Sequence, residues 1–84
     1  MACGGVVMNI ILRTFDDLNT FQKGVKFYAE DIDVRQGRYL ISGHSYLGMC
    51  SLDLSKPIDV TINTESKRIE DNFYNYLKKW EVKN

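Results

Sequence analysis

The chain has 84 residues, with 11 basic side chains, 11 acidic side chains and one histidine. This length allows one small domain, and a composition of 44% hydrophobic and 26% charged residues is typical of a soluble globular protein. A formal net charge of zero argues against a basic groove for nucleic acid and against binding to an anionic membrane surface.

Apolar, β-branched residues predict a first strand over Val6–Arg13. A turn is expected at residues 15–18. Asn19 is a cap-type residue followed three positions later by Gln22, so a helix is expected to begin near Asn19 and to continue to about Glu30. Its apolar residues are spaced at i, i+4 and i+7, as on one helix face: Phe21, Val25 and Tyr28.

Alternating residues then predict a β-hairpin, with strands over residues 31–35 and 38–42 and a tight turn at Gln36-Gly37. Ser45 is well placed as the N-cap of a short helix that runs to about Leu52. The hairpin and this helix are therefore expected to follow each other closely.

The clearest half-buried strand covers residues 58–62, where apolar and polar side chains alternate. A last amphipathic helix is expected to begin near Thr64 or Ser66. Its apolar stripe consists of Ile69, Phe73, Leu77 and Trp80.

The predicted order of elements is β-α-β-β-α-β-α. Because the strands alternate and the helices carry one apolar stripe each, we expect an α+β fold with helices packed on a single face of a sheet. The other face of the sheet should be solvated and should carry Asp31, Asp33, Asp59 and Thr61. We expect residues 1–5 to form a flexible tail and residues 6–84 a single domain.

The two cysteines, Cys3 and Cys50, have no zinc-type spacing to a second Cys or to a His. We expect two reduced thiols in a cytoplasmic protein. No segment approaches the ~20 apolar residues that a membrane span needs, and the apolar run of residues 6–12 is too short for a signal peptide.

Few residues suggest catalysis. His44 and Cys50 lie six residues apart, and we interpret them as a loop histidine and a packed cysteine rather than as a thiolate–imidazole dyad. Asp16 and Asp17 are interpreted as negative charge placed at the N-terminal end of the first helix rather than as a metal or acid–base pair. We therefore predict no catalytic residue, no metal site and no cofactor, and the protein is not expected to be an enzyme.

The segment Gly43–Leu54 carries more apolar side chains than one short helix buries in one core. An exposed apolar patch on a small domain usually marks a partner surface, whereas the alternative is that these side chains all pack inward under neighbouring loops. The side chains in question are Tyr46, Leu47, Met49, Cys50 and Leu52.

At this segment the sequence resembles the second half of HPr, the small phosphocarrier of the bacterial sugar phosphotransferase system. The resemblance rests on residues 45–52, 55–57 and 58–62, and it runs without gaps from about Val34 to Ile62. It implies a four-stranded antiparallel sheet that is covered on one face by three helices.

The resemblance also implies roles for residues of the Ser45 helix. Ser45 is similar to the regulatory serine that HPr kinase phosphorylates in Gram-positive relatives, and the same helix docks protein partners in the family. Tyr46, Leu47 and Cys50 occupy positions that resemble this docking face. Met49 and Leu52 are expected to face inward.

The first half departs from the HPr pattern. Asn19 stands where the family has its phosphorylated histidine, Phe21 where it has an arginine that steadies the phosphate, and Gln22 where it has a proline. An amide does not accept a phosphoryl group as a neutral imidazole does. The resemblance therefore implies a relative that has lost phosphocarrier chemistry at this position.

The sequence leads to one main hypothesis and two alternatives. The main hypothesis is an HPr-like regulatory protein that binds protein partners through the Ser45 helix and is controlled by phosphorylation of Ser45. One alternative is an active phosphocarrier that uses His44 as a non-standard acceptor. The other is a structural scaffold that retains only the fold.

Overall fold

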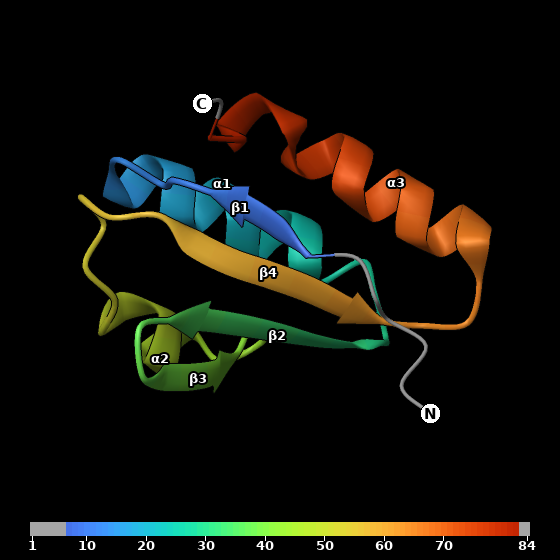
Figure 1. Ribbon diagram of the computed structural model, residues 1–84, viewed down its shortest axis with the longest axis horizontal. Helices are drawn as coiled ribbons and strands as arrows, with labels where there is room; N and C mark the ends of the chain where they lie inside the picture. The colour runs from blue at the N-terminus through green and yellow to red at the C-terminus, as the bar shows by residue number, and fades with distance from the viewer. Residues whose placement is uncertain (1–6, 83–84) are drawn as a thin grey trace.

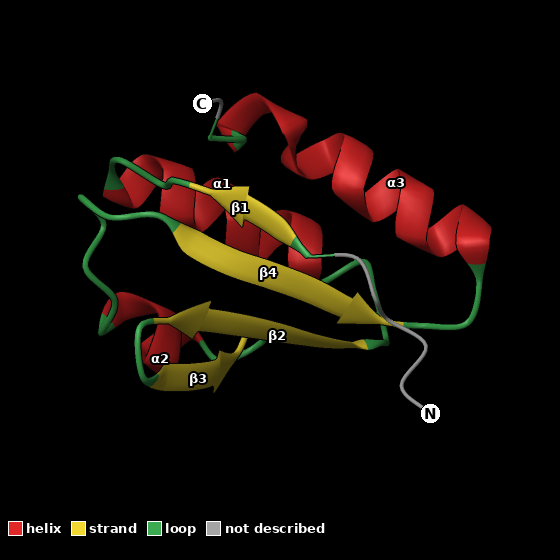
Figure 2. Ribbon diagram, in the orientation of Figure 1, coloured by secondary structure: helices red, strands yellow, loops and turns green. Residues whose placement is uncertain are grey.

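The computed structural model describes residues 7–82, which contain four strands and three α-helices (Figures 1 and 2). The strands are β1 (Met8–Ile10), β2 (Asp31–Gln36), β3 (Tyr39–Ser42) and β4 (Ile58–Asn63). The helices are α1 (Phe15–Val25), α2 (Tyr46–Cys50) and α3 (Lys67–Leu77), and a short 3-10 helix, η1 (Lys78–Trp80), follows α3.

The strands form one antiparallel sheet in the order β1-β4-β2-β3. In its register, Val60 of β4 lies between Met8 of β1 and Val34 of β2, and Val34 lies opposite Ile41 of β3. The predicted α+β class is confirmed, with a four-stranded antiparallel sheet and three helices. Among residues 7–82, no helix is long and apolar enough to cross a membrane.

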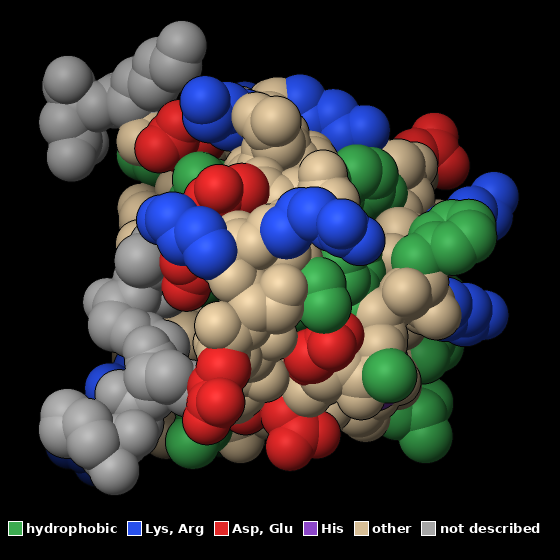
Figure 3. Space-filling model, turned by 90° about the vertical axis from the view of Figure 1, so that its right-hand side faces the viewer, with side chains coloured by type: hydrophobic (Ala, Val, Ile, Leu, Met, Phe, Trp, Pro, Cys, Tyr) green, Lys and Arg blue, Asp and Glu red, His purple; other side chains and the backbone are tan. Residues whose placement is uncertain are grey.

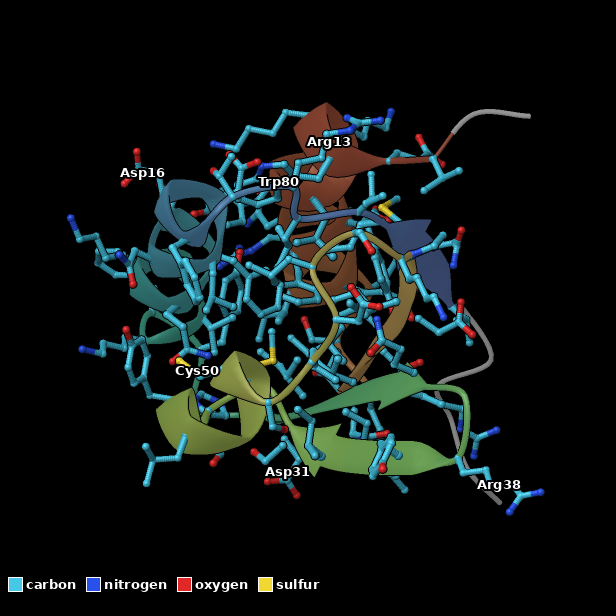
Figure 4. All side chains as sticks on the ribbon, turned by 90° about the vertical axis from the view of Figure 1, so that its left-hand side faces the viewer. Arg13, Asp16, Asp31, Arg38, Cys50 and Trp80 are labelled. Carbon is cyan, nitrogen blue, oxygen red and sulfur yellow. The ribbon has the colours of Figure 1, made fainter. Side chains whose placement is uncertain are left out.

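One cluster of buried apolar side chains joins the sheet to the helices, and Figure 4 shows side chains filling the space between them. Trp80 completes the cluster near α1, where its ring packs edge-on against Phe21 with 6.2 Å between centroids. The fully buried members are Ile10, Leu18, Phe21, Val25, Ile32, Val34, Met49, Val60, Ile62, Phe73 and Leu77.

The polar residues that alternate with these core residues remain accessible to solvent. Asp33, Asp59 and Thr61 line a shallow hollow of about 300 Å³, together with Arg35 and other residues of the same sheet face. The predicted solvated positions on β2 and β4 are confirmed, because Asp31 is exposed and the other three are only partly buried.

The first helix begins earlier than predicted. α1 starts at Phe15, and its N-cap is Thr14, whose Oγ1 accepts a hydrogen bond from the backbone N–H of Asp17 at 3.1 Å. The predicted capping box at Asn19 is therefore wrong. The segment expected to form a turn joins the helix, because in this position Leu18 becomes fully buried.

α1 also ends earlier, at Val25 rather than near Glu30. After this point the backbone N–H groups of Phe27 and Tyr28 each donate to the carbonyl three residues before, which is the pattern of a 3-10 turn. Tyr28 still packs against the core, with its ring edge-on to Phe73 at 5.2 Å between centroids.

β1 is shorter than the predicted Val6–Arg13, whose first residue lies outside the described residues. The backbone beside β1 pairs with the C-terminal segment as well as with β4. The N–H of Ile11 donates to the carbonyl of Trp80 at 3.0 Å. The N–H of Val82 donates to the carbonyl of Asn9 at 2.9 Å. A long strand is not needed here, because the other end of the chain satisfies these backbone groups.

The remaining elements lie close to their predicted positions. The hairpin turn places Gly37 at a φ of +59°, a left-handed conformation that glycine adopts without a steric penalty. Ser45 and Ser66 are the N-caps of α2 and α3, as expected. α2 ends at Cys50, slightly before the predicted Leu52.

Candidate functional site

α2 follows β3 through a tight connection. The N–H of Gly43 donates to the carbonyl of Ile32 at 2.6 Å, and a Cβ atom at Gly43 would lie only 2.7 Å from a methyl carbon of Ile32. Glycine is therefore required for this close approach. Two residues later, the Oγ of Ser45 accepts a hydrogen bond from the backbone N–H of Gly48 at 3.1 Å and caps α2.

The side chains of α2 and the residues after it divide into an inner and an outer set. Met49 is fully buried and Leu52 is 8% exposed, so their predicted inward orientation is confirmed. On the outer side, Leu47 is 83% exposed, Tyr46 is 50% exposed and Cys50 is partly buried. We call Tyr46, Leu47 and Cys50 the α2 surface.

Cys50 connects the α2 surface to the core. It packs against the buried cluster, and in Figure 4 it lies on the side of α2 that is nearer to α1. A hydrogen bond with the side chain of Cys50 raises the pKa of Tyr46 above the usual tyrosine value. The Tyr46 phenol and the Cys50 thiol thus stand together at the edge of the α2 surface.

A second feature lies between α1 and α2. A hollow of about 310 Å³ opens here, which we call the His44 hollow. The Nε2 of Gln22 donates a hydrogen bond to the carbonyl of Gly43 at 2.6 Å and joins the two elements. The residues that line the hollow are Asn19, Gln22, Lys23, Lys26, His44 and Tyr46.

The ring of His44 is held by the segment that follows α1. Its Nε2 lies 2.9 Å from the carbonyl oxygen of Glu30. Because a carbonyl oxygen only accepts hydrogen bonds, Nε2 is the ring nitrogen that carries hydrogen in this pair. The interpretation of His44 as a loop histidine and of Cys50 as a packed cysteine agrees with these contacts.

The other predicted residues are found as follows. Asn19 is exposed at the fifth position of α1, not at its beginning, and its correspondence to the family phosphoacceptor stays a prediction. Asp16 and Asp17 lie in the first turn of α1, where the helix dipole favours negative charge, as expected. Cys50 carries a free thiol, whereas Cys3 lies outside the described residues.

Sequence reasoning did not find the His44 hollow. A signal was present, because Asn19, Gln22, Lys23 and Lys26 are spaced at three and four residues and so share a polar helix face. The contact of this face with His44 depends on the packing of α1 against the loop before α2, which no local pattern predicts.

Exposed apolar side chains also occur elsewhere on the described part of the chain. Hydrophobic side chains gather along one edge of the face shown in Figure 3, while acidic and basic side chains are interspersed over the rest of it. The strongly exposed large apolar residues are Val7, Phe15, Phe27, Tyr39, Leu40, Tyr46 and Leu47.

No family model, curated protein sequence or solved structure matches the chain. The resemblance to HPr therefore stays a prediction based on the residues quoted for it.

Proposed function

We propose that the chain is an HPr-like regulatory protein that binds protein partners through the α2 surface. The observation that carries this proposal is the contrast between Leu47, which is 83% exposed, and Met49, which is fully buried two residues later. α2 thus keeps a large aliphatic side chain in solvent while its inner side is packed. Such exposure favours a partner surface.

The arrangement of the elements supports an HPr-like fold with three helices on one face of the sheet. The order β-α-β-β-α-β-α is the order expected from the resemblance. Buried residues of all three helices share one cluster with the buried residues of β2 and β4. The opposite sheet face keeps Asp33, Asp59 and Thr61 accessible to solvent.

Control by phosphorylation of Ser45 is the second part of this proposal. Ser45 is exposed and directly precedes Tyr46 and Leu47. A phosphate on its Oγ adds a charge of about −1.5 to −2 beside these side chains. A partner with an apolar pocket is then repelled, and a partner with an arginine cluster is recruited. The protein acts in the cytoplasm in this proposal, without catalysing a reaction.

The docking proposal is tested with two matched leucine substitutions. Leu47→Ala removes an exposed leucine from the α2 surface, and Leu40→Ala removes a leucine that is 60% exposed on β3. We expect a partner purified on the parent chain to lose affinity at least tenfold for Leu47→Ala and to keep its affinity for Leu40→Ala. Equal affinity for both variants would show that α2 is not the docking surface and would favour the scaffold alternative.

Regulation through Ser45 is tested separately with Ser45→Asp and Ser51→Asp. Ser51 is exposed at the other end of α2, where its Oγ donates to the carbonyl of Gly48 at 2.6 Å. We expect Ser45→Asp to change partner affinity more than Ser51→Asp, with both variants folded in urea titrations. Unchanged affinity for Ser45→Asp would contradict the regulatory role.

One observation favours phosphocarrier activity at His44 as a second candidate function. His44 is exposed and lines the same hollow as Asn19, Lys23 and Lys26, and ammonium groups stabilise a phosphoryl group. In this case, incubation with phosphoenolpyruvate and Enzyme I gives an acid-labile phosphohistidine in the parent chain and none in His44→Gln. Absence of phosphohistidine in the parent rules out this candidate.

A further inference from the structure

The His44 hollow combines cationic and hydrogen-bonding groups from two parts of the fold. α1 contributes the amides of Asn19 and Gln22 and the ammonium group of Lys23, and its C-cap residue Lys26 adds a second ammonium group. The loop before α2 contributes the imidazole of His44, and the first residue of α2 contributes the phenol of Tyr46. None of the described residues that line the hollow is an Asp or a Glu.

The two lysines are available to a ligand. Within residues 7–82, the ion pairs are those of Lys67 with Glu70 at 3.8 Å and with Asp71 at 3.7 Å. Lys23 and Lys26 therefore have no carboxylate partner among the described residues. Two unpaired ammonium groups at positions i and i+3 of one helix face lie close enough to act on the same anion.

The wall of the hollow is fixed by contacts that do not involve these lysines. Gln22 is the buried polar residue of α1, and its amide is committed to the carbonyl of Gly43. The Nε2 of His44 is committed to the carbonyl of Glu30. These two contacts fix the wall of the hollow, and the side chains left for a ligand are the exposed Lys23, Lys26 and Asn19.

We propose that the His44 hollow binds a phosphate group, carried either by a small phosphorylated molecule or by a phosphorylated residue of another protein. A dianion matches the two ammonium groups of Lys23 and Lys26, and the side-chain amide of Asn19 is a donor for one of its oxygens. The hollow of about 310 Å³ exceeds a phosphate group, which displaces a few water molecules of about 30 Å³ each, so there is room for the group that carries the phosphate.

This inference goes beyond the proposed function. It requires neither a protein partner on the α2 surface nor phosphorylation of Ser45. It also requires no transfer of the phosphoryl group to His44, because the phosphate is bound and not covalently attached.

The test is a titration with inorganic phosphate at constant pH and ionic strength, followed by NMR. His44 is the single histidine of the chain, so its ring signals are identified without ambiguity. We expect these signals and the amide signals of Asn19, Lys23 and Lys26 to shift together and to saturate. Shifts that do not saturate would overturn the proposal.

Two double variants decide whether the lysines of the hollow are responsible. Lys23→Gln with Lys26→Gln removes two positive charges from α1, and Lys67→Gln with Lys78→Gln removes the same charge from the α3 region. We expect the first pair to weaken phosphate binding about tenfold, or 1.4 kcal/mol, and the second to leave it unchanged. Equal weakening in both would mean that only the net charge of the chain matters, which contradicts a site.

Two further ligands distinguish the sources of the phosphate. Glycerol 3-phosphate represents small phosphorylated molecules, and a blocked Gly-phosphoserine-Gly peptide represents a phosphorylated protein, with the unphosphorylated peptide as its control. Tighter binding of one of them than of inorganic phosphate identifies the source. If both phosphorylated ligands bind no better than the unphosphorylated peptide, the proposal is wrong, and this outcome leaves the role of the α2 surface unaffected.

Discussion

α3 buries its large apolar side chains, whereas α2 leaves two of its own exposed to solvent. α3 has 11 residues and buries Phe73, Tyr74 and Leu77, and none of its large apolar side chains is strongly exposed. α2 has five residues, buries Met49 and leaves Tyr46 and Leu47 in solvent. The apolar stripe of α3 is therefore buried apart from Ile69, which is partly buried against the same core. The exposed side chains of α2 thus contrast with the packed stripe of α3, and the other strongly exposed large apolar residues among those described, such as Phe15 and Phe27, lie outside both helices.

The difference separates the packed helix α3 from α2, the helix that we propose as the docking site. The ring of Phe73 contacts two other aromatic rings, with 5.2 Å between its centroid and that of Tyr28 and 5.5 Å to that of Tyr74. α2, in contrast, is one turn of helix held by a serine cap and a single buried side chain. Substitutions on α3 should thus change stability, and those on the outside of α2 should change binding.

The largest expected effect is that of Phe73→Ala. Removing a fully buried ring costs its transfer free energy and leaves a cavity, so we expect a loss of about 3–5 kcal/mol in the free energy of unfolding. Phe27→Ala is the matched control, because Phe27 is 88% exposed, and its expected change is within about 0.5 kcal/mol. Urea unfolding measures both. A comparable loss in the two variants would contradict the assignment of Phe73 to the core.

Met49→Ala and Leu47→Ala test the inside and the outside of α2. Met49 is fully buried, so its truncation should cost about 2–5 kcal/mol. Leu47→Ala should change the free energy of unfolding by less than about 0.5 kcal/mol, because the side chain is 83% exposed. If Leu47→Ala proves as destabilising as Met49→Ala, Leu47 is a core residue and the α2 surface does not exist in solution.

Tyr74→Phe tests a hydrogen bond between α3 and the backbone of β4. The N–H of Ile62 in β4 donates to the phenol oxygen of Tyr74 at 3.2 Å, beyond the last described pair between β1 and β4, Met8 and Val60. Phenylalanine keeps the ring but removes this acceptor from a buried N–H, so we expect a loss of about 1–3 kcal/mol. Faster amide hydrogen exchange at Ile62 should accompany it. An unchanged exchange rate would show that another group accepts this N–H.

The sequence predicted elements whose signals are local. Ser45 is a cap-type residue directly before an apolar run, so the start of α2 was found, and the start of α3 at Ser66 is one of the two predicted candidates. The start of α1 was missed because Thr14 and Asn19 are both cap-type residues, and the burial of Leu18, which decides between them, depends on the finished core. The short β1 was missed because the bonds of its neighbouring backbone to residues 80 and 82 join the two ends of the chain.

The α2 surface was predicted from the sequence, whereas the His44 hollow was not. The exposure of Tyr46 and Leu47 and the burial of Met49 follow from the number of apolar side chains on one short helix and from the resemblance to HPr. The His44 hollow was not predicted, because the hydrogen bond from Gln22 to Gly43, which joins α1 to the segment before α2, links residues 21 positions apart. The spacing of polar residues on α1 predicts a polar helix face, but it does not predict that this face lies beside His44.

Removal of the serine caps compares α2 with α3 through a smaller change in the free energy of unfolding. Ser45→Ala removes the acceptor for the N–H of Gly48, and Ser66→Ala removes the acceptor for the N–H of Ile69, at 3.1 and 3.3 Å. Each should cost about 1 kcal/mol of unfolding free energy. In Ser45→Ala, the amide of Gly48 should also exchange faster, since α2 has only one turn. Equal exchange in the parent and Ser45→Ala would mean that packing of Met49 alone holds α2.

The smallest expected effect concerns alkaline pH. Burial is the main cause that raises the pKa of Tyr74 above 10.0, whereas the pKa of Tyr46 is raised mainly by its hydrogen bond with Cys50. The unfolded chain loses the proton of Tyr74 near pH 10, before the folded chain does. The stabilisation linked to this proton is therefore complete below pH 10 and is lost as the pH rises toward the pKa of the folded state.

We expect the urea midpoint of the parent chain to fall between pH 8 and pH 10.5 by more than that of Tyr74→Phe, which lacks the titrating group. Tyr46→Phe should follow the parent closely, because solvent around an exposed phenol weakens the effect of its neighbours. Each variant differs from the parent in one phenol only, so the differences between the curves isolate each phenol. A curve for Tyr74→Phe that coincides with the parent curve would show that Tyr74 titrates alike in the folded and unfolded states. A Tyr46→Phe curve that is flatter than that of Tyr74→Phe would mean that the hydrogen bond with Cys50 outweighs the burial of Tyr74.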